Sequence, residues 1–234
     1  MKLLSLLFLL FTVSTTTSAQ LASKVMKLKN GSDITKNVPV RDRYLYDEFY
    51  EGKVHFRNGT ISIASLNYSL FHGEIQFITP QKDTLLLRDN DYVKKISINS
   101  DIFYFDRSHG HVQAIRDFEK VKLGKQQRLL VMGHEKYAGY SEYSETSAIS
   151  SYSHFSNSNG EMQKLETNDK LLLRKKSIYY LIDQNLRFSS ANRVNFIKIF
   201  PGHRTKISSF IKDNNTDFLK ENDIVKLLEY CQSL

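Results

Sequence analysis

The middle of the chain alternates apolar and polar residues with a period of two from Gly52 onward. The clearest alternating runs are β-branched or aromatic: Val54–Phe56, Ile61–Ile63, Ile75–Phe77, Ile96–Ile98 and Phe103–Phe105. Such runs are typical of half-buried β-strands. Turn-forming residues lie between them, and Asn58-Gly59 in particular supplies the positive φ that a tight hairpin requires. The pattern therefore predicts a β meander.

Further strand candidates follow the first five along the chain. They are Thr84–Arg88, Val112–Phe118, Arg128–Met132, Met162–Leu165, Leu171–Arg174 and Ile178–Ile182. About ten strands with short connections favour one antiparallel sheet, curled into a roll or closed into a barrel. Residues 41–188 are therefore predicted to form a β-rich domain.

From Ser189 the apolar period becomes helical. Three short helices are expected, around Val194–Phe200, around Ile207–Ile211 and over Glu221–Gln232, the first after a Ser189-Ser190 cap signal. Isolated helices of about three turns are marginal in water, so they must pack together or against the sheet. Residues 189–234 are predicted to be a helical C-terminal cap on the sheet or a small domain beside it, which makes the fold class α+β.

The N-terminus has the order of regions found in a secretory signal peptide. A lysine is followed by the apolar run Leu3–Val13 and by small residues that end at Ala19. Cleavage is expected after Ala19, which makes residues 1–19 a signal peptide and predicts an exported protein. The polar residues 20–40 show no lasting periodicity and are expected to be a mobile leader.

Composition limits the class of partner. The chain of 234 residues is 41% hydrophobic and 12% aromatic, enough for a packed core, and its formal net charge is +8. Later segments are too short to span a membrane, and a bacterial lipid anchor would require a cysteine at the cleavage site. The basic residues are scattered and no nucleic-acid recognition motif is present, so nucleic acid is not an expected partner. Attraction to anionic lipid or polysaccharide stays open.

The single cysteine, Cys231, has a structural interpretation. Ile224, Leu227, Leu228 and Cys231 follow the spacing of one helical stripe. The thiol is therefore expected to be a small apolar core group rather than a nucleophile. With one cysteine, the chain has no internal disulfide.

A segment rich in tyrosine and serine interrupts the strand pattern at residues 137–160. It holds eight serines and four tyrosines among 24 residues, the tyrosines being Tyr137, Tyr140, Tyr143 and Tyr152. With almost no aliphatic residues it is not expected to fill a core. It is predicted to be an exposed loop or long hairpin whose rings bind a glycan or an envelope protein; a plain insertion between two strands is the alternative.

Two of the histidines are candidates for a metal site or a catalytic site. His109 and His111 stand two residues apart, a spacing that puts two imidazoles on one side of a strand and suits a metal, with Asp106 the only local carboxylate. Gly110, however, lies in a predicted turn, which favours an exposed pair of turn residues over a metal site. A hydrolase acting on envelope material, with its site near these histidines, is the enzymatic alternative.

Motifs of known chemistry are missing from the sequence. There is no G-x-S-x-G nucleophile elbow, phosphate-binding glycine loop, dinucleotide fingerprint or zinc-type cysteine spacing. The sequence therefore assigns no catalytic residue and no cofactor. The expected function is that of a non-catalytic binding or structural module of the cell envelope.

Several stretches of the chain resemble sequences found in one protein family. They are Tyr44–Phe49, Gly52–Gly59, Leu66–Tyr68, Gln76–Phe77, Lys82–Leu85 and, in the helical tail, Phe200–Ile207, Phe210–Lys212, Asp223–Leu228 and Tyr230–Leu234. Together they resemble an uncharacterised family of small exported envelope proteins of the Bacteroidota, with a β-rich body, a short helical tail and no assigned activity. The resemblance implies a location in the periplasm or at the outer cell surface. It also implies that Thr84, in Asp83-Thr84-Leu85, is a site of protein O-glycosylation; an ordinary strand start is the alternative.

Overall fold

The computed structural model describes residues 25–29, 37–87, 90–138, 142–146 and 170–234. Twelve antiparallel strands form one sheet in these residues. They are β1 (Val25–Lys29), β2 (Tyr50–Phe56), β3 (Ile61–Ser69), β4 (Glu74–Ile78), β5 (Thr84–Leu86), β6 (Val93–Ile98), β7 (Asp101–Asp106), β8 (Gly110–Asp117), β9 (Val121–Ala138), β10 (Glu142–Thr146), β11 (Lys170–Asp183) and β12 (Phe188–Ser190). The helices are α2 (Val40–Arg43), α3 (Arg193–Ile199), α4 (Arg204–Asp213) and α5 (Glu221–Gln232), with a short 3-10 turn at Asn90–Tyr92.

The α+β class and the antiparallel sheet predicted from the sequence are confirmed. The sheet order is β1-β11-β9-β8-β7-β6-β2-β3-β4-β5, with β10 beside β9 and β12 beside β11. Closure into a barrel is not seen among the described strands, because β1 and β5 end the pairing path at opposite edges. The sheet does fold back on itself, since the β3–β4 turn reaches β9 through a hydrogen bond from Leu129 N to Leu70 O of 2.8 Å.

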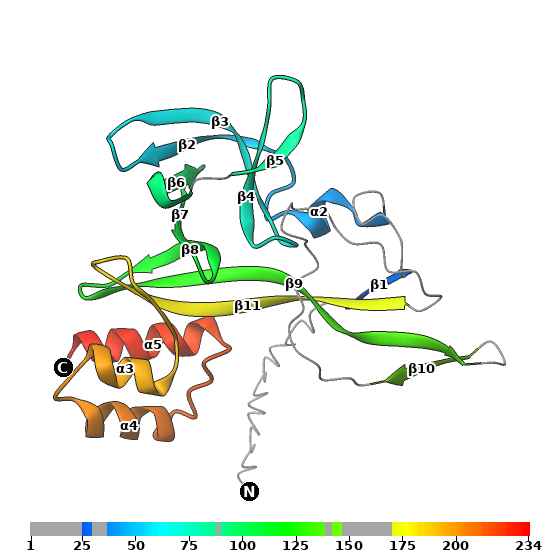
Figure 1. Ribbon diagram of the computed structural model, residues 1–234. Coiled ribbons are helices and arrows are strands. Elements are labelled where there is room, and N and C mark those ends of the chain that lie inside the picture. The colour runs from blue at the N-terminus through cyan, green and yellow to red at the C-terminus, as the bar shows by residue number, and fades with distance from the viewer. Residues whose placement is uncertain (1–24, 30–36, 88–89, 139–141, 147–169) are drawn as a thin grey trace, which may run out of the picture.

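Two long strands, β9 and β11, form the spine of the molecule (Figure 1). They pair along almost their whole length, with one irregularity between Leu172 and Leu173. Leu129, Leu171 and Leu173 pack into the core beneath β2 to β7, whereas Leu123 and Leu181 pack into the core beneath the helices. The same two strands thus serve both hydrophobic cores.

The three C-terminal helices cover one end of this spine. In Figure 1 they lie beneath β8, β9 and β11, and their buried residues, such as Phe196 and Ile207, share a core with Leu123 and Leu181. Of the two arrangements left open by the sequence, the helices form a cap on the sheet. Pro201-Gly202 follows the end of α3, and Asn214-Asn215 follows the end of α4. The cap of α3 is Asn192, whose side chain accepts a hydrogen bond from Asn195 N, and Ser189-Ser190 lies in β12 instead.

The prediction that residues 20–40 hold no element is wrong for part of that segment. Val25–Lys29 forms β1 and pairs with Lys170–Arg174 of β11. Leu28 and Val38 are buried in the core. The sequence missed this strand because five residues give little periodicity, and the partner that holds them is far away in the chain.

Candidate functional site

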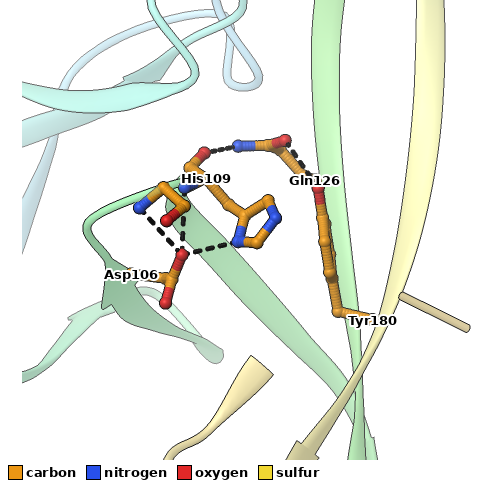
Figure 2. A network of polar contacts seen from close by, with 5 residues as sticks. Asp106, His109, Gln126 and Tyr180 are labelled. Carbon is orange, nitrogen blue, oxygen red and sulfur yellow. Dashed lines mark hydrogen bonds and ion pairs between the residues drawn. The ribbon is translucent and has the colours of Figure 1, made fainter. Parts of the chain in front are cut away.

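The turn between β7 and β8 carries a network of polar side chains (Figure 2). One carboxylate oxygen of Asp106 accepts hydrogen bonds from the backbone N–H groups of Ser108 and His109, each at 3.0 Å, and from the His109 ring at Nδ1, at 2.5 Å. An aspartate that accepts from backbone groups two and three residues later is a common way to fix a turn. The contact between Asp106 and His109 therefore stabilises the β7–β8 turn.

The same turn is fastened to the spine. The side-chain amide of Gln126, on β9, donates to the carbonyl oxygen of His109, and the hydroxyl of Tyr180, on β11, lies 3.5 Å from Gln126 Oε1. The His109 ring packs on the Tyr180 ring with centroids 4.6 Å apart (Figure 2). Since Gln126 is buried, these contacts satisfy polar groups that would otherwise destabilise the fold.

His111 faces a different environment from His109. It is fully buried, its ring lies against Phe105 at 5.2 Å, and its Nδ1 accepts a hydrogen bond from Ile75 N at 3.3 Å. The predicted exposed pair of turn residues is therefore wrong for His111. The reason is Gly110, whose φ of +79° turns the chain between the two histidines. Burial lowers the pKa of His111 from 6.5 to about 3.

The described residues do not assemble the metal site considered from the sequence. No group of three or more His, Cys, Asp or Glu side chains placed to hold a metal ion occurs within them. The structure joins His109 with Asp106, and it does not join His111 to either. Within the described part of the chain, the Asp106 carboxylate is also the only side chain hydrogen-bonded to the His109 ring, so no serine or cysteine is held there as a nucleophile.

Acid is expected to destabilise the fold through His111. Between pH 6.5 and 3 the unfolded chain binds a proton at this residue that the folded chain does not, so stability falls as pH falls through that window. The loss is about 1.4 kcal/mol per pH unit, or about 2 kcal/mol between pH 7 and pH 5. Urea unfolding over this range measures it, with His111→Gln as the comparison. An equally steep acid slope in His111→Gln would assign the loss to other groups.

A second feature is a groove where β3 and β4 separate. The groove has a volume of about 540 Å³ and is lined by Ser62–Leu66 of β3, by Phe77–Pro80 at the end of β4, and by Val54, Phe56 and Leu87. Most of these side chains are apolar. In Figure 1 the β2–β3 hairpin and the β4–β5 hairpin point apart at this place. The volume is in the range of sites that hold small ligands or peptide side chains.

Along this groove β3 has an open edge. β3 pairs with β2 from Ile61 to Leu66 but with β4 only from Leu66 to Ser69. Within the described residues no partner strand faces the other side of Ile61–Ser65. In an antiparallel ladder every second residue turns its N–H and C=O away from a given neighbour. Backbone hydrogen-bonding groups of this segment therefore point toward the groove.

The open edge lacks the features that protect other edges of this sheet. Edge strands are usually shortened or carry charges, because an apolar, unpaired edge recruits other chains. At one end of the sheet β1 carries Lys27 and Lys29, and at the other end β5 has three residues. The segment Ile61–Ser65 is free of charge, and Ile61 and Ile63 are 56% and 59% exposed. Within the described residues, Ile61–Ser65 is therefore an uncharged edge that is open to pairing with another strand.

The other residues predicted from the sequence lie elsewhere. Tyr137 and Tyr143 are paired positions of the antiparallel strands β9 and β10, whereas Tyr140 and Tyr152 lie outside the described residues. Thr84 is exposed at the start of β5, and its glycosylation stays a prediction. Cys231 is buried in the helical core, as predicted, and burial raises its pKa to about 11.

The groove was missed by sequence analysis. The sequence predicts both of its strands, at Ile61–Ile63 and Ile75–Phe77. The alternating pattern of each strand does not show at which residue the hydrogen-bonded ladder between β3 and β4 ends. Two local features of the sequence indicate it. β3 begins with the uncharged, largely exposed run Ile-Ser-Ile-Ala-Ser, and Pro80 lies two residues after the end of β4. A proline restricts further pairing beyond that point.

Comparison of the chain with protein-family models, with curated proteins and with solved structures gives no match. The resemblance to exported Bacteroidota envelope proteins therefore stays a prediction. Within the described residues, no helix has the length and apolar character needed to cross a bilayer.

Proposed function

We propose that this chain is a non-catalytic binding module of the cell envelope, which captures an extended segment of a partner protein as an added strand along β3. The observation that carries the proposal is the apolar groove beside the open, uncharged edge Ile61–Ser65. In this mode of recognition, backbone hydrogen bonds supply affinity and pockets for alternate side chains supply specificity. The signal-peptide pattern of residues 1–19 supports an exported site of action.

The length of the open edge suits a single extended strand. Five residues from Ile61 to Ser65 span about 17 Å, the length of a short extended peptide. The far wall, Phe77–Pro80, bounds the groove on the side away from β3. An extended peptide of this length would lie along β3 opposite the wall Phe77–Pro80.

A binding module is also the better account of the polar network. The Asp106–His109 pair, which a hydrolase would use to activate a nucleophile, fixes the β7–β8 turn through bonds to the backbone. Its partners Gln126 and Tyr180 hold that turn on β9 and β11. These residues thus have a structural role that needs no substrate.

Selection of random heptapeptides on the full chain tests the proposal. Enriched peptides are expected to alternate apolar residues and, on binding, to slow amide hydrogen exchange at Ile61–Ser65. Ala64→Glu places a charge in the groove and is expected to weaken binding by about tenfold or more, the equivalent of about 1.4 kcal/mol. Val194→Glu is the matched control, because it adds the same charge at an exposed residue of α3 that does not line the groove; its affinity should stay within about threefold of the parent chain.

Three outcomes would contradict the proposal. The selection could enrich no peptide, the enriched peptides could bind Ala64→Glu as tightly as the parent chain, or light scattering could show a dimer that Ala64→Glu converts to monomer. The last result would assign the edge to self-association instead of capture of a partner segment.

A further inference from the structure

A second hollow lies on the helical cap, away from the β3 groove. It has a volume of about 450 Å³ and is lined by Arg193 from α3 and by residues of α4. Three of its side chains are cations and three carry hydroxyl groups: Arg193, Arg204, Lys212, Thr205, Ser208 and Ser209. No acidic residue lines it. The hollow is therefore positively charged and rich in hydrogen-bond donors.

The helix geometry explains why these groups converge. Arg204, Ser208 and Lys212 are spaced by four residues along α4, so they form one stripe on its surface. The guanidinium of Arg193 at the start of α3 donates to Ser208 Oγ at 3.1 Å, which holds the arginine over the same stripe. Arg204 and Lys212 are two turns apart on this stripe, with the hydroxyl of Ser208 between them, so a ligand on the stripe would meet cations at both ends.

Several cations elsewhere on the described surface are matched by carboxylates. Ion pairs join Arg107 with Asp91, Arg116 with Glu229, Lys122 with Asp117, Lys125 with Glu221, and Lys220 with Asp217. Among the described residues, by contrast, Arg204 and Lys212 form no ion pair or hydrogen bond through their side chains. Asp213 follows Lys212 in the chain but does not line the hollow. No carboxylate of the described residues therefore neutralises these two cations.

We infer that the hollow binds a phosphoryl group of the monoester type. Such a group carries close to two negative charges and three acceptor oxygens, which matches cations and hydroxyl donors on one concave surface. Arginine binds phosphate oxygens through paired N–H groups, and lysine adds a point charge. Free phosphate and a phosphorylated lipid headgroup share this chemistry.

Two probes distinguish these sources. The full chain is titrated with inorganic phosphate and followed by amide chemical shifts, and it is sedimented with phosphatidylcholine vesicles that do or do not contain phosphatidic acid. Shifts of Ser208, Ser209 and Lys212 with phosphate alone assign a site for a small phosphorylated ligand. Sedimentation with phosphatidic acid in the absence of such shifts assigns a lipid headgroup. Either result supports a phosphoryl-binding site in the hollow.

A pair of variants with equal charge separates the hollow from general basicity. Arg204→Gln with Lys212→Gln removes two cations from the hollow, whereas Lys198→Gln with Lys206→Gln removes two exposed cations of α3 and α4 that do not line it. The first pair is expected to weaken the response by about tenfold or more, because it removes two groups that donate charge-assisted hydrogen bonds to phosphoryl oxygens. The second pair is expected to change it by less than about threefold.

The inference is overturned by either of two results. Equal losses in the two double variants would show diffuse attraction between a basic protein and any anion. The absence of a response to both probes at low salt, where charge attraction is strongest, would show that the hollow binds no phosphoryl group. Neither result bears on peptide capture at β3, since the hollow and the groove share no residue.

Discussion

Phe196→Ala is expected to lower the free energy of unfolding by about 3–5 kcal/mol, because it removes a fully buried aromatic side chain and leaves a cavity. Phe196 lies in the core that α3, α4 and α5 share with β9 and β11. The sheet and the helices are therefore expected to unfold together at a lower urea concentration. Circular dichroism and amide hydrogen exchange on β9 and β11 report the two parts separately.

Val194→Ala is the control for this experiment. Val194 is on the same helix but is 61% exposed, so its truncation should change stability by less than about 0.5 kcal/mol. The prediction would fail if Phe196→Ala melted the helical signal while amide protons of Leu123 and Leu181 kept the protection they have in the parent chain. That result would make the cap an independent unit.

Gly73→Ala is expected to destabilise the protein by about 2–4 kcal/mol, for two reasons. Gly73 has a φ of +67°, which costs a residue with a side chain about 1 kcal/mol. An added Cβ would also lie 2.1 Å from Arg128 Nε, so the guanidinium must move, at a cost of about 1–3 kcal/mol. Moving it disturbs the bond from Arg128 Nη2 to His72 O, at 2.9 Å, which helps to hold the β3–β4 turn on β9.

Gly59→Ala isolates the contribution of Arg128. Gly59 also has a positive φ, +91°, but nothing lies within 4 Å of the position of an added Cβ. Its substitution should therefore cost only the conformational part, about 1 kcal/mol. Urea denaturation of both variants measures the difference. Equal losses in the two variants would mean that Arg128 adapts without cost and that the turn is not held as described.

Local patterns were sufficient for elements whose stability is encoded in neighbouring residues. The helix at Glu221–Gln232 was predicted at its observed bounds, because its apolar stripe and its acidic first turn are both local. The Asn58-Gly59 hairpin was recognised for the same reason, and Gly59 has the positive φ that the turn requires.

Longer-range pairing explains the elements that were misjudged. The sequence divided β11 into two strands at Lys175 and Lys176, yet β11 continues through them because β9 pairs with both residues. Arg128–Met132 was likewise only the middle of β9. β1 was missed because its five residues depend on Lys170–Arg174. In each case the partner strand lies far away in the chain, where no local period can show it.

The same limit applied to the candidate sites. Residue types and spacing grouped His109 with His111, but the turn at Gly110 directs one to the surface network and the other to the interior. The β3 groove depends on where the β3–β4 ladder ends, and the basic hollow depends on Arg193 of α3 meeting Ser208 of α4. Both sites are properties of packing between separate elements.

The continuous β9–β11 ribbon has a mechanical consequence. Because these strands are built into the core beneath β2 to β7 and also into the core beneath the helices, the two ends of the molecule have no hinge between them within the described residues. A protein segment held at the β3 end and a phosphorylated surface held at the helical end would be kept at a fixed separation and orientation. With both proposed sites occupied, the β9–β11 ribbon would act as a rigid spacer between the two partners.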